Sequence, residues 1–125
     1  MRLIDDFFHI TESCVIDSEN IKCSVSLNES HVIYKAHFIG NPITPGVCVV
    51  QMAAEILGHF TGKDLVMRRA KSIKFKRAIS PTSRPVFTFS KIARDGDNVR
   101  ASVSVDDESG QFVKMVGVEF ESSVA

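Results

Sequence analysis

The residues of this chain that could do chemistry lie around one expected loop-to-helix junction. His37 stands nine residues before Gly46, where an apolar helix is expected to begin, and Gln51 and Glu55 follow on that helix one turn apart. An imidazole can act as a general base near neutral pH. The first backbone N–H groups of a helix stabilise a carbonyl oxygen that gains negative charge. The junction therefore combines a candidate base with a candidate oxyanion hole.

This combination suits the removal of a proton from the carbon next to a thioester carbonyl. Loss of water from a 3-hydroxyacyl thioester also requires an acid, which protonates the departing hydroxyl. Gln51 holds no labile proton near neutral pH, although its amide can orient a water or a hydroxyl. A carboxyl group shielded from water can hold such a proton, so Glu55 is the candidate acid.

Each of these residues also has a purely structural interpretation. His37 could cap the loop by hydrogen bonding to backbone carbonyls. Glu55 could pair with a nearby Arg or Lys, or lie exposed, and Gln51 could line a site without catalysing. Cys48 together with His37 suggests a nucleophile with its base. A cysteine in an apolar helix usually packs, however, and we expect packing here.

A stiff loop and a long helix must position these side chains. Residues 39–46, "IGNPITPG", contain two prolines, which remove backbone donors and bias the preceding residues away from helix. The pattern from Gly46 to about Phe60 predicts a helix, which ends at Gly58, Thr61 and Gly62. On a helical wheel the apolar half holds Val47, Val49, Val50, Ala53, Ala54, Ile56, Leu57 and Phe60. The remaining stripe holds Cys48, Gln51, Met52, Glu55 and His59.

Strand-like segments flank the helix on both sides. Residues 7–17 and 21–27 predict a hairpin around the turn "DSEN", and residues 31–38 predict a short extended piece. After the helix, strands are expected within 72–79, 85–93, 98–105 and 111–120, with turns at "RDGDN" and "DDESGQ". We therefore predict one α+β domain over residues 1–125, in which an antiparallel sheet of about five to seven strands wraps a single helix.

The charge balance excludes one group of partners. Lys plus Arg equals Asp plus Glu, 15 of each, so no net field draws the chain to nucleic acid or to an anionic membrane. An anionic partner would need a local patch. The candidate patch is formed by Arg68, Arg69, Lys71, Lys74, Lys76 and Arg77.

The cysteines and the N-terminus indicate the compartment. The chain has three cysteines, an odd number, and neither these nor His9, His31 and His59 show a metal-ligand spacing. The first ten residues carry two acids where a signal peptide would be apolar, and no segment approaches the ~18 apolar residues of a membrane span. We expect reduced thiols in a cytoplasmic protein, without a metal site or membrane insertion.

The segment "HFIGNPITPGVCVVQMAAE" resembles the signature of the hotdog-fold 3-hydroxyacyl-[acyl-carrier-protein] dehydratases, and "NESHVIYKAHF" and "IKFKRAISP" resemble their flanking strands. The resemblance implies that His37 is the catalytic histidine and that the amides at Gly46 and Val47 polarise the thioester carbonyl. Position 51 matches the catalytic glutamate or aspartate and holds Gln51 here, whereas Glu55 falls where a glutamine is common. The residues expected to bind substrate are Phe38, Pro45, Gly46, Val47 and Val50.

Three interpretations of this exchange stay open. In the first, Glu55 supplies the acid from one turn deeper along the helix, about 6 Å away. In the second, His37 takes the proton and a bound water is the acid, which gives a slow dehydratase. In the third, the chain has lost dehydration. It then hydrolyses an acyl thioester as a thioesterase, or it binds the acyl thioester or acyl carrier as a non-catalytic subunit that partners a catalytic homologue.

The resemblance also implies the reaction and the partners. The reaction is removal of water from a 3-hydroxyacyl thioester to give a trans-2-enoyl thioester, in fatty-acid or related acyl biosynthesis, without metal or organic cofactor. An acyl carrier protein would deliver the acyl chain on its phosphopantetheine arm and dock on the basic patch. Two copies would pair edge to edge as a homodimer, with a higher homo-oligomer or a heterodimer with a homologue as alternatives, and each site would take residues from both copies.

Overall fold

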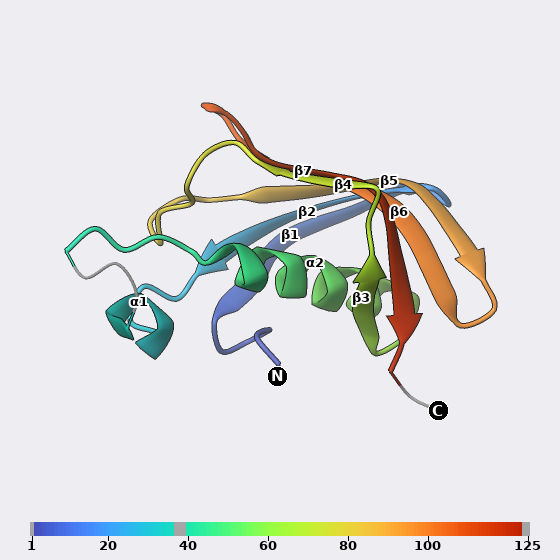
Figure 1. The fold of residues 1–125 in the computed structure, drawn as a ribbon, viewed down its shortest axis with the longest axis horizontal. Helices are drawn as coiled ribbons and strands as arrows, with labels where there is room; N and C mark the ends of the chain where they lie inside the picture. Colours follow the sequence, from blue (N-terminus) through green and yellow to red (C-terminus); the bar gives the residue numbers. More distant parts are fainter. Residues whose placement is uncertain (1, 37–39, 124–125) are drawn as a thin grey trace.

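The computed structural model describes residues 2–36 and 40–123, in which one long helix packs against one sheet and a short helix precedes it in the chain (Figure 1). His37 and Phe38 lie outside the described residues, so their roles stay predictions. The elements in chain order are β1 (Phe8–Asp17), β2 (Asn20–Leu27), α1 (Val32–Ala36), α2 (Gly46–Thr61), β3 (Leu65–Arg69), β4 (Ser72–Phe75), β5 (Val86–Asp95), β6 (Asn98–Asp107) and β7 (Gly110–Ser122).

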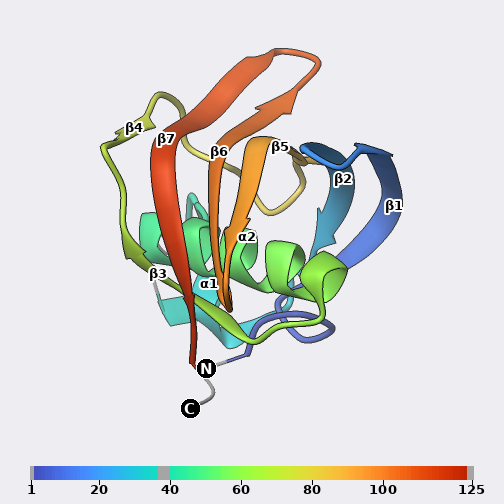
Figure 2. The same cartoon turned by 90° about the vertical axis from the view of Figure 1, so that its right-hand side faces the viewer.

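The seven strands form a single antiparallel sheet in the order β1-β2-β5-β6-β7-β3, and β4 also pairs with β7. The helix α2 lies across one face of this sheet, and α1 lies beyond the N-terminal end of α2 (Figures 1 and 2). Six phenylalanines are fully buried in the core: Phe7, Phe8, Phe87, Phe89, Phe112 and Phe120. The predicted α+β architecture, one long helix wrapped by an antiparallel sheet, is confirmed.

The predicted hairpin turns are confirmed. In the turn between β1 and β2, Asp17 Oδ1 accepts hydrogen bonds from the Glu19 N–H at 2.8 Å and from Asn20 Nδ2 at 2.9 Å. This is why a polar "DSEN" segment reverses the chain. The β5–β6 turn contains Gly96 at φ 61°, a left-handed conformation that glycine adopts without steric cost.

The prediction that residues 31–38 are extended is wrong for residues 31–36, the part of this segment that the structure describes, because Val32–Ala36 form the helix α1. His31 caps this helix, since its Nδ1 accepts a hydrogen bond from the Ile33 N–H at 3.1 Å. Tyr34 is then buried and stacks on Phe7. Strand β3 was also missed, because its five residues follow directly on the end of α2 and its pairing with β7 is long-range.

The helix α2 runs from Gly46 to Thr61, close to the predicted bounds. Gly62 ends it in a left-handed conformation, and its N–H donates to the Gly58 carbonyl. Two residues outside the expected apolar half, Cys48 and Met52, are also buried in the core. Val47, expected on the apolar half, is instead 74% exposed. No helix among the described residues is long and apolar enough to cross a membrane.

Candidate active site

The N-terminus of α2 presents unpaired backbone amides. Pro45 is the N-cap residue, with φ −60° and ψ 141°, and it makes no side-chain cap. Its carbonyl accepts the first helical hydrogen bonds, from the N–H groups of Cys48 at 3.0 Å and Val49 at 3.2 Å. None of the described residues accepts a hydrogen bond from the N–H of Gly46 or Val47. These two amides lie at the positive end of the helix, where the sequence predicts an oxyanion hole.

A groove of about 390 Å³ opens beside these amides. Its apolar wall comes from Val49 of α2, the buried Ile79 and the buried Val113 of β7. The ring of Phe75, on β4, covers Gly46 so closely that a Cβ on this glycine would meet the ring at 3.0 Å. The absence of a side chain at position 46 thus lets an aromatic ring approach the helix start. Apolar walls with a few polar groups are typical of grooves that bind small molecules.

The loop before α2 is fixed both to α1 and to the segment that connects β4 with β5. Thr44 is buried, and its N–H donates to the Ile79 carbonyl at 2.8 Å. Its Oγ1 lies 2.8 Å from the hydroxyl of Tyr34 on α1. Burial raises the pKa of Tyr34 to about 12, so this phenol is neutral at physiological pH. The hydrogen bond therefore joins α1, which ends one residue before His37, to the segment that leads into the oxyanion hole.

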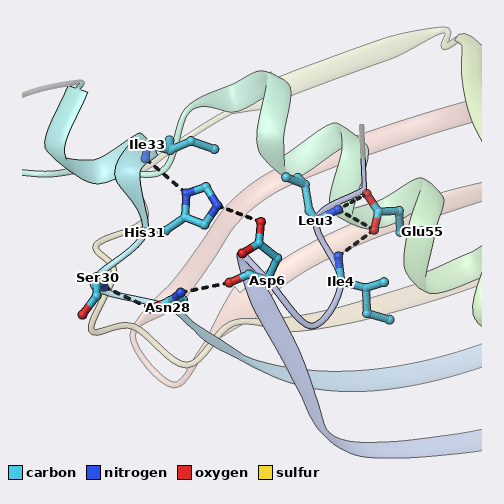
Figure 3. A network of polar contacts seen from close by, with 8 residues as sticks. All are labelled: Leu3, Ile4, Asp6, Asn28, Ser30, His31, Ile33 and Glu55. Atoms are coloured by element: carbon cyan, nitrogen blue, oxygen red, sulfur yellow. Dashed lines mark hydrogen bonds and ion pairs between the residues drawn. The ribbon is translucent and has the colours of Figure 1, made fainter.

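Gln51 and Glu55 form a hydrogen-bonded pair on α2. The Gln51 Nε2 donates to Glu55 Oε2 at 2.9 Å. Glu55 Oε1 accepts from the N–H groups of Leu3 at 2.9 Å and Ile4 at 2.7 Å, and the Leu3 N–H also lies 2.8 Å from Oε2 (Figure 3). Glu55 makes no ion pair with an Arg or Lys of the described residues. Its carboxylate is instead held by backbone N–H groups.

The N-terminal segment that Glu55 holds also contacts the residues before α1. Its Asp6 accepts a hydrogen bond from His31 Nε2 at 3.1 Å, and the Asp6 carbonyl accepts from Asn28 Nδ2 at 2.9 Å (Figure 3). Because His31 Nδ1 already accepts from the Ile33 N–H, the ring proton lies on Nε2. Residues 3–6 therefore bridge α2 and the start of α1.

Cys48 packs as expected. It is 3% exposed, and burial raises the pKa of its thiol, which reduces the thiolate needed for nucleophilic attack. Among the described residues no group of three or more His, Cys, Asp or Glu side chains could hold a metal ion.

Half of the expected basic patch is engaged in ion pairs. Arg68 pairs with Glu121 at 2.6 Å, Arg69 pairs with Glu119, and Arg77 pairs with Asp107 at 2.7 Å. The three lysines, Lys71, Lys74 and Lys76, are exposed and make no ion pair with any described residue. Lys74 lies directly opposite Lys114 in the β4–β7 register. Like charges in such a cross-strand pair are destabilising, so negative charge beside these two lysines would relieve their repulsion.

The structure brings together part of the predicted substrate site. Gly46 lines the groove and Pro45 precedes it, Val50 is half-buried against the core, and Val47 points to solvent. Sequence reasoning missed Phe75, which lies over the helix start and is 55% exposed. It also missed the N–H groups of Leu3 and Ile4, since backbone donors carry no sequence signal.

Comparisons with known proteins agree on one family. The family model described as ApeI-like, ApeI dehydratase, matches residues 13–115. A 3-hydroxyacyl-[acyl-carrier-protein] dehydratase FabZ from Fusobacterium nucleatum is 31% identical over 101 residues, which cover 77% of this chain and 60% of the relative. A FabZ from Ligilactobacillus salivarius is 32% identical over 94 residues, which cover 68% and 66%. The chain thus spans about three fifths to two thirds of the length of these curated relatives.

Solved structures show the same fold. A chain of the dehydratase heterocomplex ApeI:P from Xenorhabdus doucetiae superposes with a TM-score of 0.68 at 10% identity, over 90% of this chain and 94% of that chain. A hypothetical thioesterase with coenzyme A from Streptococcus pneumoniae gives a TM-score of 0.61 at 12% identity, over 90% and 84%. The predicted hotdog fold is therefore confirmed.

Proposed function

The chain belongs to the ApeI-like dehydratase family, and on that premise we propose that it removes water from a 3-hydroxyacyl thioester carried by an acyl carrier protein. The product is a trans-2-enoyl thioester, as in fatty-acid biosynthesis. The observation that carries the proposal is the uncapped start of α2, where Gly46 lines a groove of about 390 Å³ and the amides of Gly46 and Val47 have no acceptor among the described residues.

The proposed reaction begins when the thioester oxygen accepts hydrogen bonds from these two amides. The imidazole of His37 then takes a proton from C2, and the electrons of the C2–H bond move toward the carbonyl, where the helix start stabilises the negative charge. The double bond between C2 and C3 forms as the C3–O bond breaks. The departing hydroxyl gains a proton and leaves as water.

This chain differs from the dehydratase signature in the residue that would supply the proton for the leaving group. Gln51 has no acid proton to give, but its amide can orient the hydroxyl or a water that relays the proton. Both oxygens of Glu55 accept hydrogen bonds, whereas an acid must donate from one of them. We therefore propose His37 and Gln51 as the residues at the reacting atoms, with a slow, water-relayed protonation. Glu55 as the acid stays a prediction, which Glu55→Gln tests: loss of turnover with the fold intact supports it, and an undiminished rate rules it out.

The carrier protein is proposed to dock beside the groove. Lys74 and Lys114 stand opposite each other on adjacent strands, and Lys76 lines the groove itself. Their positive charges, unpaired among the described residues, complement an acidic carrier and the phosphate of its arm. A second copy of the chain is proposed to complete the site by pairing edge to edge, as a homodimer.

A non-catalytic role is the rival, and the specific observation that favours it is the glutamine at position 51. In that case the chain would hold an acyl carrier beside a catalytic homologue. A thioesterase is a further alternative within enzymes.

One assay separates the three functions. The purified protein is mixed with 3-hydroxyacyl and saturated acyl groups on acyl carrier protein. A rise in enoyl absorbance from the 3-hydroxyacyl substrate alone supports dehydration, and release of free thiol from either substrate supports hydrolysis. Binding of the carrier without product supports the non-catalytic subunit and contradicts the proposed lyase.

A further inference from the structure

Phe75 stands at the end of β4, where its ring faces the start of α2. The Cε1 and Cζ atoms of the ring lie 3.0 Å, and Cδ1 lies 3.6 Å, from the point that a Cβ on Gly46 would occupy. These three atoms form one side of the ring, so the ring presents an edge to the glycine. Phe75 also lines the groove beside Gly46 and is 55% exposed. The ring therefore forms part of the groove wall next to the first residue of α2.

The backbone around Phe75 is fastened to β7. Phe75 pairs with Val113, which is buried and lines the same groove. The N–H groups of the next two residues, Lys76 and Arg77, both donate to the Phe112 carbonyl, at 2.7 Å and 3.2 Å. The strand that carries the ring is thus held in place beside the helix start.

The contact leaves no room for a carbon atom between the ring and Gly46. Carbon atoms in favourable contact lie about 3.5–4.0 Å apart, so a methyl group at the Cβ position of Gly46, at 3.0 Å, would overlap the ring. A thioester whose oxygen binds the Gly46 amide brings C2 to the same part of the groove, because C2 is bonded to the carbonyl carbon. A hydrogen on C2 needs little space there, whereas a methyl group on C2 needs the space of a whole carbon atom.

We propose that Phe75 is a specificity-determining residue, whose ring restricts the site to acyl thioesters without a branch at C2. This rests on the proposed dehydratase function and names its substrate class. A 2-methyl-3-hydroxyacyl thioester keeps one hydrogen on C2, so a base can still remove a proton and water can still leave. The chemistry therefore accepts both kinds of substrate, and the wall beside Gly46 separates them.

Two unreactive probes test this restriction apart from turnover. Each probe is a saturated acyl pantetheine in which a CH₂ group replaces the sulfur, so it can neither lose water nor be hydrolysed. One probe is unbranched, the other has a methyl group at C2, and titration calorimetry gives the Kd of each. We expect the natural chain to bind the branched probe at least about 10-fold more weakly, because one carbon more or less in an apolar pocket is worth about 10-fold to 200-fold.

Removal of the ring should remove this preference. In Phe75→Ala the two Kd values should differ by less than about 3-fold, because the wall that excludes the methyl group is gone. Ile16→Ala is the matched control, since Ile16 on β1 is similarly exposed, at 58%, and does not line the groove; it should keep the preference of the natural chain. Equal binding of both probes by the natural chain, or an unchanged preference in Phe75→Ala, would overturn the proposal. If Phe75→Ala does not fold, Phe75→Leu decides: a reduced preference supports the proposal and an unchanged one overturns it.

Failure of the proposed function is read separately, from enoyl formation. If the natural chain forms no enoyl product but prefers the unbranched probe through Phe75, the dehydratase proposal fails and the restriction at C2 stands for an acyl-binding groove. If neither probe binds while enoyl product forms, the dehydratase proposal stands and the restriction by Phe75 is overturned.

Discussion

Gln51 donates its side-chain N–H to Glu55 across one turn of α2, at 2.9 Å. The pair lies on the helix whose first residues form the proposed oxyanion hole. Because Glu55 is engaged with backbone amides of the N-terminal segment, the chemistry of position 51 depends on contacts far away in the sequence.

Substitution of Gln51 by glutamate should increase dehydration. The new carboxyl would lie about as close to Glu55 as the amide now does, and two carboxyl groups at such a distance share a proton, which supplies the missing acid. We expect kcat to rise at least about tenfold, since general acid catalysis contributes about 10²–10⁴-fold. The gain should be present at low pH and disappear as rising pH removes the shared proton. An unchanged rate in Gln51→Glu, measured as enoyl formation, would show that the acid is not what limits this site.

The Tyr34–Thr44 hydrogen bond should stabilise the loop that leads into α2. Tyr34→Phe leaves the buried Thr44 hydroxyl without this partner, which costs about 1–2 kcal/mol in the free energy of unfolding. Thr44→Val should cost a similar amount. The double variant should cost less than the sum of the two, because both polar groups are then absent. Urea unfolding measures the free energy of unfolding of each variant, provided that its slope against urea concentration does not change. If the losses of the two single variants add up to the loss of the double variant, the two hydroxyl groups are not coupled.

The carrier-docking site should be visible in the salt dependence of catalysis. Lys74→Ala and Lys114→Ala should each raise the KM for a substrate on acyl carrier protein several-fold and weaken its dependence on ionic strength. The same variants should leave the KM for a short pantetheine thioester unchanged. Lys22→Ala, on β2, serves as the control. Equal effects on both substrates would place these lysines in the acyl site instead of a docking surface.

The thiols should differ in reactivity according to burial. Burial raises the pKa of Cys23 to about 11 and raises the pKa of Cys48 as well, so at pH 8 both stay protonated, and access to them is blocked. Alkylation of the folded protein should therefore modify Cys14, which is exposed, and alkylation in denaturant should modify all three cysteines. Mass spectrometry counts the adducts. Rapid native labelling of Cys48 would revive the nucleophile interpretation.

The helix and the hairpins were predictable because their signals are local. Helical periodicity from Gly46 and the glycines after Phe60 bound α2, and polar turns such as the one at Asp17 bound the strands. α1 was not predictable from residues 31–38, because its β-branched residues favour a strand and the helix depends on the His31 cap and the burial of Tyr34. Tertiary contacts override local preference there.

The sequence could predict which side chains belong to the candidate site, but not which distant segments contact them. The motif from His37 to Glu55 indicated a helix start, an amide and an acid in one place, and the structure places Gly46, Gln51 and Glu55 on one helix. The partners of Glu55 are backbone amides near the N-terminus, and the ring over Gly46 comes from Phe75 of β4. Both contacts arise from the packing of distant segments, which no local pattern encodes.

The proposed dehydration depends most on whether His37 takes the C2 proton beside the α2 amides. Enoyl formation from a 3-hydroxyacyl group on acyl carrier protein, measured for the natural chain and for His37→Ala, tests this directly. We expect steady enoyl production by the natural chain and a loss of about 100-fold or more in kcat in the variant, with its fold intact by circular dichroism. Equal rates in the two proteins, or no enoyl from either, would contradict it.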